Sequence, residues 1–164
     1  MTSTKTPLRN KNKKTVVAVS GGFDPLHIGH ARMFREAKKL GGKLVVILNN
    51  DNWLIKKKGY AFMPQKERAE LLMSIRWVDD VFITKHSPDT QDMSVCRELK
   101  KLRPDIFVNG GDRKKDNIPE VAVCSQYGIK MIFNIGAGGK VQSSSWLVNK
   151  HANTAAQRTT LRKK

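Results

Sequence analysis

Two histidines lie three positions apart in a glycine-containing segment, GGFDPLHIGH, which spans residues 21–30. In the first turn of a helix, His27 and His30 would lie on the same side. Gly29 between them leaves out a side chain where a phosphate would approach the backbone. The free N–H groups of a helix N-terminus attract anions, and two imidazoles beside them can stabilise negative charge on a phosphate. The segment therefore predicts phosphate chemistry, whereas either histidine alone would be read as a capping, core or loop residue.

The elements that must position this segment alternate between strands and helices. Apolar, β-branched runs predict strands at residues 15–20, 43–48, 80–84, 105–109 and 129–135. Amphipathic patterns predict helices at 27–40, 64–76, 91–102 and 119–126, and a last helix that begins at residue 146. This order is typical of a parallel sheet with right-handed crossovers. We therefore expect a doubly wound α/β domain with five strands, which binds ligands at the carboxyl ends of its strands.

The positive charge is concentrated at the two ends of the chain. The chain has 164 residues, 31 of them Lys or Arg and 14 Asp or Glu, which gives a formal net charge of +17. Residues 1–14 and 150–164 each hold five basic residues and no acidic one, so these tails carry +10 and residues 15–149 carry +7. We expect one domain at 15–149 between two basic flexible tails, which are candidates for binding an anionic partner.

Several classes of protein are disfavoured by composition. No apolar run approaches the roughly 18 residues of a membrane span. The basic start of the chain is not followed by the apolar segment of a secretory signal. Two cysteines, Cys96 and Cys124, are too few for a disulfide scaffold. We therefore expect a protein without a membrane span in the reducing environment of the cytoplasm.

The segment at residues 21–30 resembles the HxGH signature of the cytidylyltransferase-like nucleotidyltransferases, a family with a Rossmann-like fold. The resemblance continues in the family's order over roughly residues 15–149. The lysines at 56–58 resemble its phosphate-neutralising lysines, and KERAELLMSIRWVDDVFI at 66–83 resembles its basic helix and following strand. RPDIFVNGGDRKKDNIPE at 103–120 is similar to the RPD-x-x-VKGGDY segment of the heptose-1-phosphate adenylyltransferases. VQSSSWLV at 141–148 resembles the family's serine and threonine motif.

This resemblance implies a role for each matching residue. The catalytic residues would be His27, His30, Lys57 and Arg68. The nucleotide would be bound by Gly21, Gly22, Phe23, Asp24, Gly29, Gly110, Asp112, Lys140, Ser143, Ser144 and Ser145, and the substrate phosphate by Lys56 and Lys58. Mg²⁺ would be held mainly by the nucleotide phosphates, without dedicated protein ligands, and the protein would be a homodimer.

Each of these motifs also has a structural explanation. The lysine run could be a solvated face, and Arg68 could belong to the polar face of its helix. The serines could cap a helix, and Gly110, Gly111 and Asp112 could form a turn.

The implied activity is nucleotidyl transfer, in which CMP or AMP passes from CTP or ATP to a polyol or sugar phosphate and pyrophosphate is released. The best matches are the glycerol-3-phosphate cytidylyltransferases and the heptose-1-phosphate adenylyltransferases. Many cytidylyltransferases have Thr or Ser where this chain has Gly22, and an Arg near the position of Lys140, which weakens the prediction of CTP.

Two alternatives remain at this point. Pantetheine-phosphate adenylyltransferases share GGFDP and SSS but have Thr in place of His27. A nucleic-acid-binding protein on the same fold would explain the basic tails, although the sequence offers no recognition helix or stacking motif.

Overall fold

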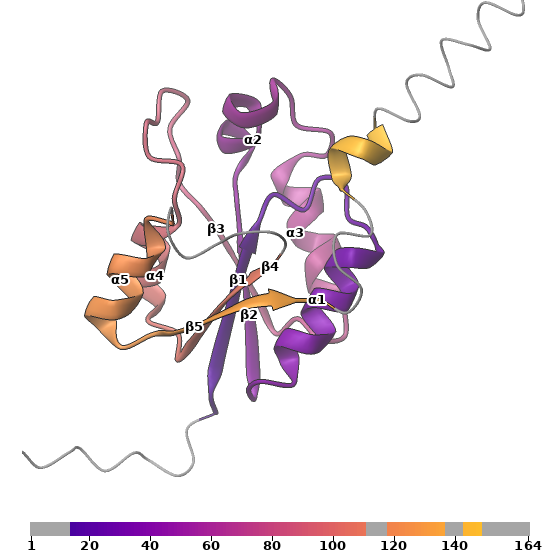
Figure 1. Ribbon diagram of the computed structural model, residues 1–164. Helices are drawn as coiled ribbons and strands as arrows, with labels where there is room; N and C mark the ends of the chain where they lie inside the picture. The colour runs from indigo at the N-terminus through magenta and orange to yellow at the C-terminus, as the bar shows by residue number, and fades with distance from the viewer. Residues whose placement is uncertain (1–13, 111–117, 137–142, 149–164) are drawn as a thin grey trace, which may run out of the picture.

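The computed structural model describes residues 14–110, 118–136 and 143–148, and contains a five-stranded sheet with helices on both faces (Figure 1). The strands are β1 (Val16–Gly21), β2 (Lys43–Leu48), β3 (Asp80–Ile83), β4 (Ile106–Gly110) and β5 (Lys130–Ile135). All four strand pairings are parallel, in the order β3-β2-β1-β4-β5. The expected doubly wound α/β fold is confirmed, and each expected strand agrees with an observed one to within a residue at either end.

The sheet topology determines where a ligand can bind. The chain leaves β1 toward β2 and β3 on one side, then returns to place β4 and β5 on the other side of β1. The order therefore reverses between β1 and β4, and doubly wound sheets bind ligands at the carboxyl ends of the strands beside such a reversal. In Figure 1 these carboxyl ends, helix α2 and the short helical segment at residues 144–148 all lie at the top of the sheet.

Alternating side chains of the strands form a separate core on each face of the sheet. Val17 and Val19 pack on one face with the helices α1 (Ile28–Lys38) and α3 (Gln65–Met73). Ala18 packs on the other face with α4 (Cys96–Leu102) and α5 (Glu120–Tyr127). Burial on both faces explains why the strands are continuous apolar runs rather than alternating ones.

One helix at the carboxyl edge was not predicted. α2 (Asp51–Lys58) follows shortly after β2, in a stretch where the sequence pattern predicts neither a strand nor a helix. Its polar, lysine-rich sequence buries only Trp53 and Leu54, so it shows little helical periodicity. The end signals were present nevertheless: Asn50 Oδ1 accepts a hydrogen bond from the Trp53 N–H, and Gly59 ends the helix at φ +85°.

The helix expected at residues 91–102 begins later than predicted, at Cys96. The Asp92 carboxylate accepts a hydrogen bond from the Ser94 N–H at 2.9 Å, which stabilises a turn in place of the first helical turn. The Trp53 indole N–H also donates to the Met93 carbonyl at 2.8 Å. The loop from β3 to α4 is therefore attached to α2.

Among the residues that the structure describes, no helix is long and apolar enough to cross a membrane.

Replacing a buried ring of α1 tests whether this helix depends on the core. Phe34 is fully buried and lies 5.2 Å, between ring centroids, from Phe23 in the loop after β1. We expect Phe34→Ala to lower the free energy of unfolding by about 3–5 kcal/mol, measured by urea denaturation. Phe62→Ala is the matched control, because Phe62 is 58% exposed, and it should change stability by less than about 1 kcal/mol. Equal losses in the two variants would contradict this core assignment.

Candidate active site

The two histidines of the GGFDPLHIGH segment lie face to face at the start of α1. Their ring centroids are 3.7 Å apart, with an interplanar angle of 21°. His27 is the N-cap of α1, and its Nδ1 accepts a hydrogen bond from the Gly29 N–H at 3.1 Å. A neutral His27 ring therefore carries its proton on Nε2, which makes Nε2 a hydrogen-bond donor.

Both imidazoles are held in the neutral form. Burial lowers the pKa of His27. Burial, reinforced by the nearby His27 and Lys58, lowers the pKa of His30 to about 3. Phe23 meets the His30 ring edge-on at 4.9 Å, and His30 Nδ1 is buried with no hydrogen-bond partner among the described residues. At neutral pH the pair can therefore donate hydrogen bonds to a phosphate but contributes no positive charge to its binding.

The loop before the histidines is fixed by its own buried side chains. Phe23 is buried with φ 50°, a backbone conformation that is costly for a residue other than glycine. Asp24 is also buried, and its two carboxylate oxygens accept hydrogen bonds from the Phe62 N–H at 2.7 Å and the Met63 N–H at 2.8 Å. Both side chains were expected to contact the nucleotide. In this structure they hold the loop instead.

Arg68 is placed differently from the expected phosphate contact. Its side chain is fully buried, and its guanidinium donates to the carbonyls of Gly22, Asn49 and Met63 and to the Asp51 carboxylate, at 2.5–2.9 Å. The alternative, in which Arg68 belongs to the solvated face of its helix, is wrong because the side chain is buried. The helical pattern placed Arg68 correctly on α3, but no sequence pattern indicated that loops from three other segments would close over it.

The three lysines lie on the last turn of α2 rather than on a loop. Lys56 and Lys57 are exposed, and Lys57 Nζ lies 4.4 Å from the centroid of the Trp53 ring. Lys58 is half-buried and donates to the Asp24 carbonyl at 2.9 Å. Burial is the largest cause that lowers the pKa of Lys58. The structure thus joins the lysine segment to the histidine loop through Lys58 and Asp24.

The glycines of the site lie close to side chains of the protein itself. A Cβ at Gly22 would lie 2.7 Å from Leu54 Cδ2, and one at Gly21 would lie 2.9 Å from the Phe23 ring. A Cβ at Gly29 would lie 3.0 Å from the His27 ring, and one at Gly110 would lie 2.5 Å from Met33 Sδ. Gly29 therefore makes room for the capping imidazole, a reason that differs from the expected close approach of a phosphate.

The serine motif lies beside the histidine loop, although 119 positions of sequence separate the two atoms that join them. Ser144 Oγ donates to the Pro25 carbonyl at 2.9 Å. Ser143 Oγ accepts from the Trp146 N–H at 3.1 Å, so it caps the segment at residues 144–148, and Ser145 is exposed. The structure brings the first and last expected motifs together. Two further expected nucleotide contacts, Asp112 and Lys140, lie outside the described residues.

Two buried asparagines at the same edge of the sheet were not among the expected site residues. Asn49 follows β2 and Asn109 is the last residue but one of β4, on either side of β1. Both are only 4% exposed, and Asn49 Oδ1 and Asn109 Nδ2 have no hydrogen-bond partner within the described part of the chain. A polar residue at the end of an apolar strand was the sequence signal that would have identified them.

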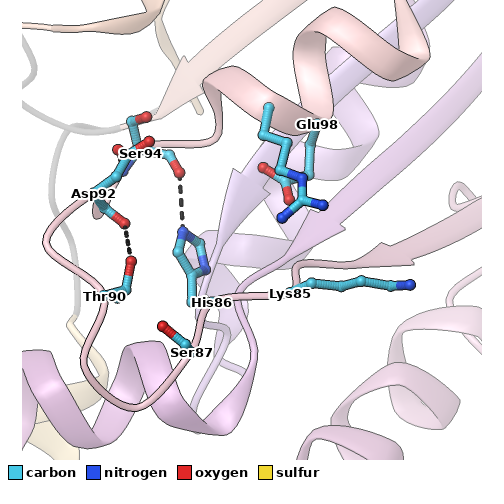
Figure 2. Close-up of a pocket in the computed structure, with 8 residues that line it drawn as sticks. Lys85, His86, Ser87, Thr90, Asp92, Ser94 and Glu98 are labelled. Atoms are coloured by element: carbon cyan, nitrogen blue, oxygen red, sulfur yellow. Dashed lines mark hydrogen bonds between the residues drawn. The ribbon is translucent and has the colours of Figure 1, made fainter.

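A separate pocket of about 280 Å³ lies at the carboxyl end of β3 (Figure 2). It is lined by Lys85, His86, Ser87, Thr90, Asp92, Ser94, Arg97 and Glu98, and includes none of the expected site residues. The His86 ring reaches across the loop, with Nε2 3.1 Å from the Ser94 carbonyl. Helix α2 contacts both this loop, through Trp53, and the histidine loop, through Leu54 beside Gly22.

The described residues include no group of three or more His, Cys, Asp or Glu side chains that could hold a metal ion. The two acidic side chains nearest the histidine loop are already bound, Asp24 to backbone N–H groups and Asp51 to Arg68. Among the described residues, these two carboxylates are therefore engaged in contacts within the protein.

Stability at mildly acidic pH tests the environment of His30. The unfolded chain protonates His30 near pH 6.5, whereas the folded protein keeps it neutral to about pH 3. Protonation therefore favours the unfolded state as the pH falls below 6.5, and stability is lost in that direction. We expect protonation of His30 in the unfolded chain to lower the free energy of unfolding by about 1.5 kcal/mol between pH 6.5 and pH 5. In urea titrations at both pH values, His30→Gln should lose correspondingly less stability than the wild type. Equal losses would show that His30 titrates normally.

Comparisons with known proteins agree with the fold and with the histidine segment. The sequence model of the family described as cytidylyltransferase-like matches residues 18–134. An FAD synthase of Thermococcus kodakarensis is 40% identical over 107 residues, covering 65% of this chain and 68% of that protein. An FAD synthase of Pyrococcus abyssi is 39% identical over 106 residues, covering 64% and 68%. The bifunctional protein HldE of Streptomyces coelicolor is 36% identical over 116 residues, which cover 70% of this chain and 24% of that protein.

A solved structure shows the same architecture. The lipopolysaccharide core biosynthesis protein from Thermoplasma volcanium superposes with a TM-score of 0.60 at 26% identity, covering 76% of this chain and 98% of that one. The family match spans the sheet and the histidine segment, and the structural match reproduces the arrangement that positions them. The chain belongs to the cytidylyltransferase-like family and is a nucleotidyltransferase.

Proposed function

We propose that the protein transfers a nucleotidyl group from a nucleoside triphosphate to the phosphate of a small molecule, with release of pyrophosphate. The observation that carries the proposal is the stacked pair of His27 and His30 at the N-terminus of α1, where β1 ends beside the reversal of strand order. The serine motif and the lysine-bearing end of α2 are both bonded to the same loop. Phosphate-binding groups from three distant segments therefore converge on one edge of the sheet.

ATP is the donor that the comparisons and the sequence favour over CTP. Two of the similar proteins are named FAD synthase, and FAD contains an AMP moiety joined to FMN. The position where cytidylyltransferases carry a bidentate arginine is occupied here by Lys140, which cannot form the same pair of hydrogen bonds. Adenylyl transfer is therefore the first hypothesis, and cytidylyl transfer the second.

The acceptor is a small molecule that carries a phosphate monoester. FMN is the first candidate because of the FAD synthases among the similar proteins. It is also a polyol phosphate, since its ribityl chain bears the phosphate. Sugar phosphates are the second candidate, because the similarity to the HldE protein covers 70% of this chain.

The proposed reaction is an in-line displacement at the α-phosphorus of the triphosphate. An oxygen of the acceptor phosphate forms the new bond to the α-phosphorus, and the bond from that phosphorus to the bridging oxygen of pyrophosphate breaks. His27 and His30, as neutral donors, would hydrogen-bond the oxygens on which charge develops, without a proton transfer. Lys56, Lys57 and the Ser143–Ser145 turn would hold the other phosphate oxygens. Positioning and charge neutralisation are the main contributions a protein makes to such a step.

The proposal also includes a divalent metal ion and binding partners of the protein. The described residues do not provide a metal cluster, so a divalent ion such as Mg²⁺ would be bound mainly by the nucleotide phosphates. The homodimer stays a prediction. The anionic partner of the basic tails also stays a prediction, because residues 1–13 and 149–164 lie outside the described residues.

A matrix of donors and acceptors tests the activity directly. ATP and CTP are each combined with FMN, glycerol 3-phosphate, a heptose 1-phosphate and 4′-phosphopantetheine in the presence of MgCl₂, and pyrophosphate release is measured. We expect turnover with ATP and FMN to exceed every other pair by at least about tenfold, a difference of about 1.4 kcal/mol in the barrier. Turnover with 4′-phosphopantetheine alone would support the pantetheine branch instead. No pyrophosphate from any pair would refute nucleotidyl transfer to these acceptors.

The histidine pair is tested by His30→Ala. Loss of one preorganised donor to developing charge typically lowers kcat by about 10²–10³-fold. We expect that loss in pyrophosphate release, with a circular dichroism spectrum like that of the wild type. His151→Ala is the matched control, because His151 lies outside every motif that resembles the family, and it should stay within about twofold of wild type. Near-normal turnover of His30→Ala would contradict the mechanism.

A further inference from the structure

We propose that Arg68 is a positioning residue, which fixes the histidine loop against α2 and the loop that follows it, and that it makes no contact with substrate phosphate. The family resemblance assigned it to phosphate, and its burial in the structure is the reason to reassign it. The proposal rests on the proposed function only in that its kinetic readout is nucleotidyl transfer.

The donors of Arg68 are already used within the protein. Nε donates to the Met63 carbonyl at 2.9 Å, and one terminal nitrogen donates to the carbonyls of Gly22 at 2.6 Å and Asn49 at 2.9 Å. The other terminal nitrogen pairs with Asp51 at 2.5 Å. At least four of the five N–H groups of the guanidinium are therefore engaged. A phosphate would have to displace these bonds and also reach a side chain that is not exposed.

The four acceptors come from segments that must be aligned for the site to work. Gly22 begins the histidine loop, Asn49 follows β2, Asp51 begins the helix that carries the lysines, and Met63 lies between α2 and α3. One rigid, planar group thus sets the distance between the helix that carries the lysines and the loop that carries the histidines. A flexible ammonium cannot reproduce this fork of donors.

Asp24 makes the complementary connection at the same junction. Its carboxylate accepts from the N–H groups of Phe62 and Met63, while the Met63 carbonyl accepts from Arg68. The backbone of Met63 is therefore held on one side by the histidine loop and on the other by α3. Both buried charges act on one junction, so removing either should displace the same loop.

The kinetic test compares Arg68→Lys with the wild type. A shift of about 1 Å in a catalytic group can cost about 100-fold in rate. We expect kcat to fall by about that factor while KM for the triphosphate stays within about threefold, since the exposed lysines still bind it. A direct phosphate contact predicts the reverse, with KM for the triphosphate rising at least tenfold and kcat largely kept. That result would overturn the proposal, as would near-normal kcat in Arg68→Lys.

Two further variants keep the test decisive where Arg68→Lys fails to fold. Asp24→Asn and Asp51→Asn leave Arg68 in place but remove one connection each, and both should lower kcat more than they raise KM. Where Arg68→Lys does fold, the double variant Arg68→Lys, Asp24→Asn should lose less than the product of the single losses, because the residues act on one junction. Independent, multiplicative losses would contradict a shared role. Arg76→Lys is the control, since Arg76 is exposed, and should stay near wild type.

An NMR measurement that does not depend on enzyme turnover tests the positioning role separately from the proposed function. In two-dimensional NMR spectra, the Gly29 amide reports its hydrogen bond to His27 Nδ1. We expect that resonance to shift in Arg68→Lys and Asp24→Asn but not in Arg76→Lys, and the affinity for a non-hydrolysable ATP analogue to change by less than about threefold in every variant. An unshifted Gly29 amide would refute the positioning role even if the wild type proved inactive with every acceptor. Inactivity of the wild type would refute only the proposed function.

Discussion

The buried charge of Arg68 is the constraint on which the geometry of this site depends. A guanidinium fully removed from water loses its hydration and must recover comparable hydrogen bonds inside the protein. Three backbone carbonyls and the Asp51 carboxylate supply them, and these acceptors come from three segments at the carboxyl edge of the sheet. The loops cannot relax independently without leaving a buried donor unpaired. The loops of the site are thus held in place by the hydrogen bonds of one buried charge rather than by regular secondary structure.

In the proposed mechanism, different side chains donate hydrogen bonds and supply positive charge. Burial keeps His27 and His30 neutral, so these rings would act through their N–H groups, and the cap of α1 fixes the orientation of His27. The positive charge would come from Lys56 and Lys57, which are exposed on a neighbouring helix. Preorganised dipoles stabilise charge that develops during a reaction without moving, whereas flexible cations can follow a polyphosphate as it binds and leaves.

The sequence predicted the strands and most helices, because the side-chain patterns of these elements repeat along the chain. Strands such as Lys43–Leu48 are continuous apolar runs, and their order with the helices was sufficient for the doubly wound topology. The start of α4 was misplaced because the Asp92–Ser94 turn and the Trp53 bond to Met93 replace its first helical turn. Helix α2 was missed because its polar sequence shows little helical periodicity, although Asn50 and Gly59 mark its ends. The burial of Arg68 and Asp24 was not predicted either. Burial of a charged residue depends on which distant segments close over it, and one sequence does not contain that information in a local pattern.

The charge distribution becomes clearer once α2 is recognised as a helix. The two tails account for +10 of the net +17, so the bulk charge says little about the site. Within the domain, Lys56, Lys57 and Lys58 occupy the last turn of α2, where the carbonyl end of the helix dipole favours cations. Lys58 donates to the Asp24 carbonyl, whereas Lys56 and Lys57 are exposed on the same turn. The three lysines therefore stabilise the end of a short helix, and Lys58 also ties this helix to the histidine loop. The density of lysines at one helix end thus says more about the electrostatics of the site than the total charge of the chain does.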